Sequence, residues 1–179
     1  MNNYLDILPR VKAFIFDVDG VLTDGVVTLM PDGEQVRHMN IKDGYALQLA
    51  VKKGYKTGII SGGTSEPAKI RLQKLGIKDL YFGVSDKLEK FEEFCIIHDL
   101  SPKEILYMGD DIPDYEVMAQ CGLPCCPADA ASEIKKISLY ISDKKGGEGC
   151  VRDVIEKVMK AQNNWFDISH SEEFAQFKW

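Results

Sequence analysis

Short apolar runs alternate with amphipathic stretches along most of this chain. Residues 11–16, 55–60 and 105–108 are mostly apolar and rich in β-branched or aromatic side chains, which is typical of strands buried on both faces of a parallel sheet. Two further short strands are predicted at residues 79–82 and 139–141.

The stretches between these strands have the apolar spacing of helices. Because strands and helices alternate, we predict a Rossmann-like α/β fold, a parallel sheet with helices on both faces. Asp43 is a suitable N-cap for the first helix. The predicted helices cover residues 44–53, 65–75, 87–98, 114–121 and 151–162.

One segment departs from this alternation. Residues 26–30 and 34–39 flank the turn sequence Pro31-Asp32-Gly33, so residues 26–39 are predicted to form a protruding β-hairpin. Residues 1–179 are expected to form a single domain, because no linker or internal repeat divides them. Residues 163–179 form a C-terminal tail of mixed aromatic and polar residues.

Composition narrows the function classes. The 179 residues are 45% apolar and carry a formal net charge of −6, which indicates a globular protein and argues against strong nucleic-acid binding. No apolar run is long enough to cross a bilayer, and residues 1–10 lack the pattern of a signal peptide. We therefore expect a cytoplasmic protein with no membrane partner.

The five cysteines do not point to a disulfide framework, because their number is odd and no secretion signal accompanies them. Cys121, Cys125 and Cys126 lie close together, but a fourth zinc ligand at a regular spacing is missing. We interpret them as small core thiols.

Acidic residues follow two of the predicted strands. Asp17 and Asp19 come directly after residues 11–16, and Asp110, Asp111 and Asp114 come after the third apolar strand. Carboxyl ends of parallel strands meet at one sheet edge, where ligands bind. Each group alone is compatible with a turn or a helix cap. Together they favour a divalent cation, because clustered carboxylates are costly to desolvate without one.

A hydroxyl and a lysine complete the pattern. Ser61 closes the second strand and is followed by Gly62 and Gly63, whose exposed N–H groups suit a phosphate. Lys87 begins a helix. Either feature alone is weak evidence, since Ser-Gly-Gly is a common loop and most lysines are solvated.

In order and spacing these elements resemble the four motifs of the haloacid dehalogenase superfamily. The matching residues are DxDGxxxDG at 17–25, IISG at 59–62, SDK at 85–87 and GDDxxD at 109–114. The resemblance spans nearly the whole chain. It implies a phosphatase in which Asp17 attacks phosphorus to form an aspartyl-phosphate, and in which Asp19 is the general acid and then the general base.

The resemblance also implies roles for the remaining site residues. Mg²⁺ would be bound by Asp17, the backbone carbonyl of Asp19 and Asp110, while Ser61 and Lys87 hold the phosphoryl oxygens. Asp111 and Asp114 would support the metal or orient Lys87.

The spacing of the motifs leaves no room for the cap domain that many relatives carry. Only 37 residues separate Thr23 from Ser61, and 25 separate Ser61 from Lys87. The chain therefore resembles the capless branch, whose hairpins assemble a homotetramer and whose active sites are covered by a neighbouring subunit. The alternative is a hairpin that folds over its own core. Its apolar members are Val27, Leu29, Val36 and Met39.

Within that branch the chain resembles the 3-deoxy-D-manno-octulosonate 8-phosphate (KDO 8-phosphate) phosphatases, in DVDGVLTDG, DKLEKFEEF and the glycine-rich residues 146–149. This implies a phosphorylated sugar acid as substrate, consumed in lipopolysaccharide precursor synthesis. Gly63 departs from the pattern, because the octulosonate enzymes usually carry a basic residue there. A 2-keto-3-deoxynonulosonate 9-phosphate (KDN 9-phosphate) phosphatase is thus an alternative. The expected substrate-binding residues are Gly62, Arg71, Lys74 and Arg152.

Two other classes also place an acidic site in a parallel α/β fold. One is a signalling receiver domain, which also has a phosphorylated aspartate, a hydroxyl and a lysine, but usually has its adjacent acidic pair after the first strand. The other is a non-catalytic assembly module, for which loss of Asp17 would have no chemical consequence.

Overall fold

The computed structural model describes residues 3–166. Its central sheet has six strands in the order β5-β4-β1-β6-β7-β8, and every neighbouring pair is parallel. The parallel α/β prediction is confirmed. The strands of this sheet are β1 (Ala13–Phe16), β4 (Lys56–Ile60), β5 (Asp79–Tyr81), β6 (Ile105–Met108), β7 (Leu123–Cys126) and β8 (Tyr140–Ile141).

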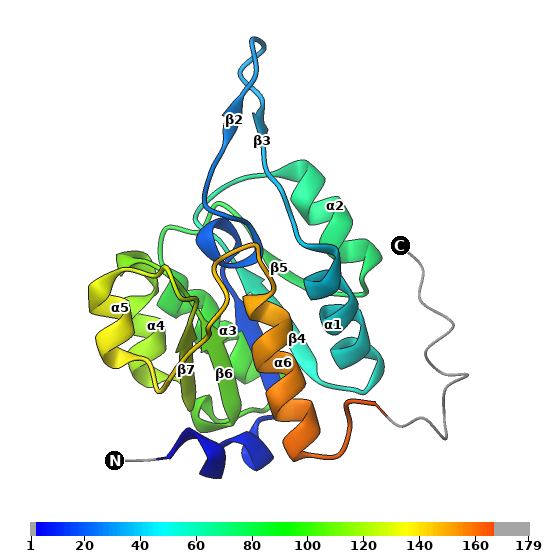
Figure 1. The fold of residues 1–179 in the computed structure, drawn as a ribbon, viewed down its shortest axis with the longest axis vertical. Coiled ribbons are helices and arrows are strands. Elements are labelled where there is room, and N and C mark those ends of the chain that lie inside the picture. The colour runs from blue at the N-terminus through cyan, green and yellow to red at the C-terminus, as the bar shows by residue number, and fades with distance from the viewer. Residues whose placement is uncertain (1–2, 167–179) are drawn as a thin grey trace.

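Residues 3–166 also contain six α-helices and several short 3-10 turns, which connect or flank these strands (Figure 1). The α-helices are α1 (Ile41–Lys52), α2 (Glu66–Lys74), α3 (Lys87–His98), α4 (Tyr115–Gln120), α5 (Ser132–Ile137) and α6 (Cys150–Ala161). The 3-10 turns are Tyr4–Asp6, Leu8–Arg10, Pro102–Glu104 and Ile112–Asp114.

The core lies in two layers, one on each face of the sheet. Along β1, Phe14 and Phe16 pack with side chains of α1, α2 and α6, whereas Ala13 and Ile15 pack with α3, α4 and α5. All four residues are buried, as expected for a strand covered on both faces. This burial explains why β1 appears in the sequence as an almost unbroken apolar run.

The predicted hairpin protrudes from this body (Figure 1). It consists of β2 (Thr28–Leu29) and β3 (Gln35–Val36), which pair in antiparallel fashion. An isolated bridge between Thr23 and Met39 closes its base. No cap domain interrupts residues 3–166, and no helix among them is long and apolar enough to cross a membrane.

The start of α1 corrects the sequence prediction. The helix begins at Ile41, and its N-cap is Asn40, whose side-chain oxygen accepts a hydrogen bond from the N–H of Lys42 at 2.8 Å. Asp43 is the third residue of α1, within its first turn, and is buried, and its Oδ1 accepts a hydrogen bond from the N–H of Arg152 at 2.7 Å. Asp43 therefore links two helices instead of capping one.

Strand β7 and helix α5 were not predicted. Pro124 within β7 argued against a strand, because proline cannot donate to a ladder. Its carbonyl still accepts a hydrogen bond from the N–H of Leu139 at 2.9 Å, and pairing with β8 begins only at Cys125. All five cysteines are free and buried, so they are core thiols as predicted. The predicted tail beyond residue 166 lies outside the described residues.

Candidate active site

Asp17 lies at the carboxyl end of β1, in the middle of the sheet. Its Oδ1 accepts a hydrogen bond from the N–H of Val18 at 2.7 Å, and its Oδ2 lies 3.0 Å from Nζ of Lys87. Asp17 is 7% exposed, so one face of its carboxylate remains accessible in an otherwise buried position. Lys87 is the first residue of α3 and reaches this edge from the neighbouring layer.

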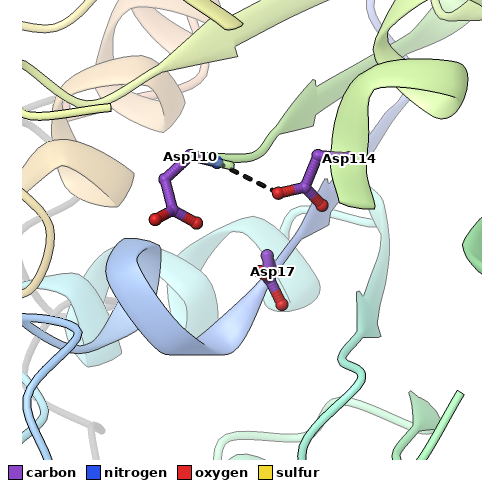
Figure 2. Close-up of side chains that lie close together, drawn as sticks. All are labelled: Asp17, Asp110 and Asp114. Carbon is purple, nitrogen blue, oxygen red and sulfur yellow. Dashed lines mark hydrogen bonds between the residues drawn. The ribbon is translucent and has the colours of Figure 1, made fainter. Parts of the chain in front are cut away.

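Asp114, in the loop after β6, contacts Lys87. Its Oδ1 lies 2.7 Å from Nζ of Lys87 and accepts a hydrogen bond of 2.7 Å from the hydroxyl of Tyr107. Its Oδ2 accepts the N–H groups of Asp110 at 3.1 Å and Asp111 at 3.4 Å. The loop thus folds around the Asp114 carboxylate, which brings Asp110 toward Asp17 (Figure 2).

Asp17, Asp110 and Asp114 form one carboxylate cluster, with an oxygen from each within 4.8 Å of the others. Burial, then the negative charge of Asp114, raises the pKa of Asp17 to about 7. Burial, then the charge of Asp17, raises the pKa of Asp110 to about 7. Although burial lowers the pKa of Lys87, the carboxylates of Asp17 and Asp114 raise it overall. One ammonium group does not neutralise three carboxylates.

The residues of this cluster fit a hard divalent cation, because they offer several carboxylate oxygens in one partly buried space. Gly20 is needed for this arrangement. It has a φ of +87°, and a Cβ on it would lie 2.0 Å from Oδ2 of Asp110. Only glycine leaves room there for the Asp110 carboxylate.

The carboxylate of Asp19 points to another partner. Its Oδ1 and Oδ2 accept hydrogen bonds from Nε and Nη2 of Arg37 at 2.7 and 3.2 Å. The expected metal ligand at Asp19 is its backbone carbonyl, so this side-chain pairing is compatible with that prediction.

Ser61 follows β4, next to β1 in the sheet. Its side chain is buried, and its Oγ accepts a hydrogen bond from the N–H of Gly63 at 3.2 Å. Gly62 is exposed at the sheet edge. The structure therefore places the predicted hydroxyl and glycine loop at the ends of adjacent strands, beside Asp17.

Comparisons with known proteins agree on one family, although no family model matches the chain. A 3-deoxy-D-manno-octulosonate 8-phosphate phosphatase from Yersinia pestis is 35% identical over 161 residues, which cover 88% of this chain and 86% of that protein. The protein of the same name from Escherichia coli K12 is 34% identical, over 86% of this chain and 81% of its own length.

Solved structures give the same result. The crystal structure of the Yersinia pestis phosphatase superposes with a TM-score of 0.89 at 33% identity, covering 92% of this chain and 89% of that one. A Moraxella catarrhalis 3-deoxy-D-manno-octulosonate 8-phosphate phosphatase, solved with magnesium, phosphate and KDO, has a TM-score of 0.89 at 30% identity and 99% coverage of both chains. This chain belongs to the KDO 8-phosphate phosphatase family.

In this member of the KDO 8-phosphate phosphatase family, the predicted substrate-binding residues do not all lie at one site. Arg71 on α2 lines a cavity of about 370 Å³ together with Arg37 of the hairpin. Nη2 of Arg71 is buried without a hydrogen-bond partner among the described residues. Lys74 is exposed.

Arg152 on α6 is held away from the carboxylate cluster. Its Nε lies 3.2 Å from Oε2 of Glu156, and its guanidinium lies 5.8 and 5.3 Å from the ring centroids of Tyr45 and Trp165. A substrate-binding role for Arg152 stays a prediction.

Two residues that contact the site are not identified by the sequence motifs. Tyr107 lies within the apolar run of β6, and nothing in that run identifies its hydroxyl as a partner of Asp114. Arg37 lies in the predicted hairpin, outside the motifs. Its alternation with Gln35, which puts both on one face of the hairpin, was the available signal.

Proposed function

We propose that this protein is a Mg²⁺-dependent phosphoric monoester hydrolase that converts KDO 8-phosphate to KDO and phosphate through an aspartyl-phosphate on Asp17. The observation that carries the proposal is the convergence of Asp17, Asp110, Asp114 and Lys87 at one sheet edge. Family membership supports the substrate, since the Moraxella catarrhalis relative was solved with magnesium, phosphate and KDO.

The residues of the chain divide the chemistry between them. Asp17 attacks phosphorus, the bond between phosphorus and the ester oxygen breaks, and Asp19 gives a proton to the departing hydroxyl. Asp19 then takes a proton from water, which attacks the aspartyl-phosphate and restores Asp17. Lys87 and Ser61 hold the phosphoryl oxygens, and Asp114 orients Lys87.

Asp17, Asp110 and the backbone carbonyl of Asp19 would bind Mg²⁺, with Asp114 and Asp111 behind them. When bound, the metal neutralises repulsion between the anionic nucleophile and the anionic ester. The raised pKa values of Asp17 and Asp110 are consistent with this role, because carboxylates gathered without a cation hold their protons more tightly.

The cavity between the hairpin and α2 is the proposed position of the sugar acid. Arg71 contributes a buried nitrogen that has no hydrogen-bond partner in residues 3–166 and is suited to a carboxylate. Gly62 offers exposed backbone at the phosphate end, and Lys74 lies one turn along from Arg71.

We also propose a cytoplasmic homotetramer of single-domain subunits in which a neighbour covers each active site. The hairpin supports this, because it exposes Val26, Val27, Leu29 and Met30 although a lone two-stranded hairpin is marginal in water. Burial of these side chains against other subunits would stabilise it.

The test is a phosphate-release assay with KDO 8-phosphate, KDN 9-phosphate and mannose 6-phosphate, with Mg²⁺ and with EDTA. We expect Mg²⁺-dependent turnover with a preference for KDO 8-phosphate. Asp17→Asn is expected to lower kcat by at least about 10³-fold, because the nucleophile is lost. Asp6→Asn, an exposed aspartate of the first 3-10 turn, is the matched control.

Three results would contradict the proposal in different ways. Full activity of Asp17→Asn would remove the mechanism. A preference for KDN 9-phosphate would replace the substrate and keep the mechanism. Stable phosphorylation of Asp17 without turnover would favour a receiver-like module.

A further inference from the structure

The Arg37–Asp19 ion pair is an interaction that the proposed mechanism does not use. Arg37 follows β3 at the base of the hairpin, and Asp19 lies two residues after the nucleophile. The pair is two-pronged, with distances of 2.7 and 3.2 Å from Nε and Nη2 to the two carboxylate oxygens. The side chain of Arg37 is only 9% exposed, so the hairpin base holds it in place.

The guanidinium of Arg37 is also supported from its far side. Its Nη1 donates a hydrogen bond to the carbonyl of Gln35 at 3.2 Å, and its Nη2 donates one to Oε1 of Gln35 at 3.3 Å. The hydrogen bond with Asp19 raises the pKa of Arg37, although burial opposes this shift. A planar guanidinium fixed at both ends defines the plane in which the Asp19 carboxylate lies.

Gly63 also lies next to the Arg37–Asp19 ion pair. A Cβ at this position would lie 3.0 Å from Oδ2 of Asp19 and 3.7 Å from Nη2 of Arg37. The missing side chain therefore leaves the space that the pair occupies. This gives a physical account of the residue at which the sequence departs from the expected pattern.

Asp19 needs such a partner because its own backbone does not fix its side chain. It lies in the Val18–Leu22 turn with extended dihedral angles (φ −76°, ψ 119°), and its side chain is 38% exposed. A carboxylate that transfers protons must point at the reacting oxygen, and small errors of orientation slow the transfer. We infer that Arg37 is a positioning residue that holds the Asp19 carboxylate in its proton-transfer orientation and so makes catalysis depend on the placement of the hairpin.

This inference rests on the proposed function, in which Asp19 protonates the leaving oxygen. A positioning role for Arg37 predicts different effects on alkyl and aryl phosphates, whereas a purely structural role predicts the same effect on both. A sugar alkoxide leaves only with a proton, whereas p-nitrophenolate is stable without one. Misplacing Asp19 therefore slows transfer from alkyl phosphates and spares transfer from p-nitrophenyl phosphate. The constant kcat/KM isolates this step, because it excludes the later hydrolysis of the aspartyl-phosphate.

The experiment measures kcat/KM for KDO 8-phosphate, mannose 6-phosphate and p-nitrophenyl phosphate with Mg²⁺. For Arg37→Gln we expect a fall of about 30-fold with both alkyl phosphates and less than about 3-fold with the aryl phosphate. The fall is smaller than the roughly 10²- to 10⁴-fold contribution of general acid catalysis, because Asp19 is still present but misplaced. Arg37→Lys keeps the charge but not the two-pronged geometry, so it should restore only part of the activity. Arg10→Gln, at an exposed arginine of the N-terminal 3-10 turn, is the matched control.

A double-mutant cycle gives a second readout. In an Asp19→Asn background, Arg37→Gln should cause no further loss with the alkyl phosphates, because the group that it positions is gone. Gly63→Ala approaches the same pair from the opposite side, and we expect it to show the same selectivity between alkyl and aryl phosphates. Size-exclusion chromatography of each variant establishes that the assembly is unchanged.

Each other outcome overturns the inference. An equal fall with all three substrates would make Arg37 structural. A fall with KDO 8-phosphate alone would make it a ligand of the substrate carboxylate. No fall would leave the ion pair without a role. If Asp17→Asn is inactive in these cases, the proposed function stands and only the role of Arg37 fails.

Discussion

Asp114 receives hydrogen bonds from Lys87, Tyr107 and the backbone of Asp110 and Asp111. It is almost completely buried, and this network offsets the cost of desolvating its charge. The residue therefore does more than orient Lys87, because it also fixes the loop that carries Asp110. A single carboxylate thus sets the distance between the expected metal ligands and Lys87, the lysine proposed to bind the phosphoryl group.

Removing the Tyr107 hydroxyl tests this network. Tyr107→Phe keeps the ring in its buried position and deletes the 2.7 Å hydrogen bond to Oδ1 of Asp114. We expect the free energy of unfolding to fall by about 1.5 to 3 kcal/mol, as for a hydrogen bond to a charged group. Urea denaturation measures the change. Tyr115→Phe, at an exposed tyrosine, should change it by less than about 0.5 kcal/mol, and an equally small effect of Tyr107→Phe would show that the bond contributes little.

At the scale of elements, Asp43 joins α1 to α6. Its Oδ1 accepts the N–H of Arg152, while its Oδ2 has no partner among the described residues. Burial raises the pKa of Asp43 from its ordinary 3.8 to about 6, although hydrogen bonds from the backbone of Arg152 and Gly149 oppose the shift. The contact between α1 and α6 therefore contains a carboxyl group that holds its proton more tightly than an exposed aspartate does.

This raised pKa predicts a pH dependence of stability. Well below pH 3.8 Asp43 is protonated in both the folded and unfolded states, so its contribution is fully present. As pH rises from there through about 6, the unfolded state ionises first and the buried group only later, so that contribution is lost across this interval. Relative to Asp43→Asn, which does not ionise, the wild type should lose about 2 kcal/mol between pH 4 and pH 7.

Urea denaturation of both proteins at several pH values measures that difference. Asp143→Asn, at an exposed aspartate, should show the same pH dependence as the wild type. A constant difference between wild type and Asp43→Asn across this range would mean that Asp43 does not titrate as its burial indicates.

The same helix shows what the sequence can and cannot specify. Apolar runs predict β1, β4 and β6. The polar residues at their ends, acidic after β1 and β6 and Ser61 after β4, predict which side chains meet, because parallel strands bring their carboxyl ends to one edge. Asn40 and Asp43 are both good N-caps, and only the contact with Arg152 decides that Asp43 is buried. Partners such as Tyr107 and Arg37 depend on contacts across 7 and 18 residues of chain, which no local pattern encodes.

At the scale of the whole molecule, the hairpin exposes apolar side chains that a lone subunit leaves uncovered. Leu29 is 73% exposed near its tip, while Arg37 at its base contacts Asp19 and lines the cavity beside Arg71. Contacts between hairpins of different subunits would therefore fix the same element that borders the active site. In the proposed tetramer, assembly and catalysis would be linked through β2 and β3.

Leu29→Glu tests this link. A charge at this exposed apolar position costs a lone subunit little but opposes burial between subunits. We expect light scattering to show four-subunit particles for the wild type and monomers for Leu29→Glu, with at least about a 10-fold loss of KDO 8-phosphate turnover. Ile96→Glu, on α3 and 80% exposed, should leave both unchanged. A fully active Leu29→Glu monomer would separate assembly from catalysis. It would show that one subunit builds the complete site, so that Arg37 and the cavity serve catalysis without help from a neighbour.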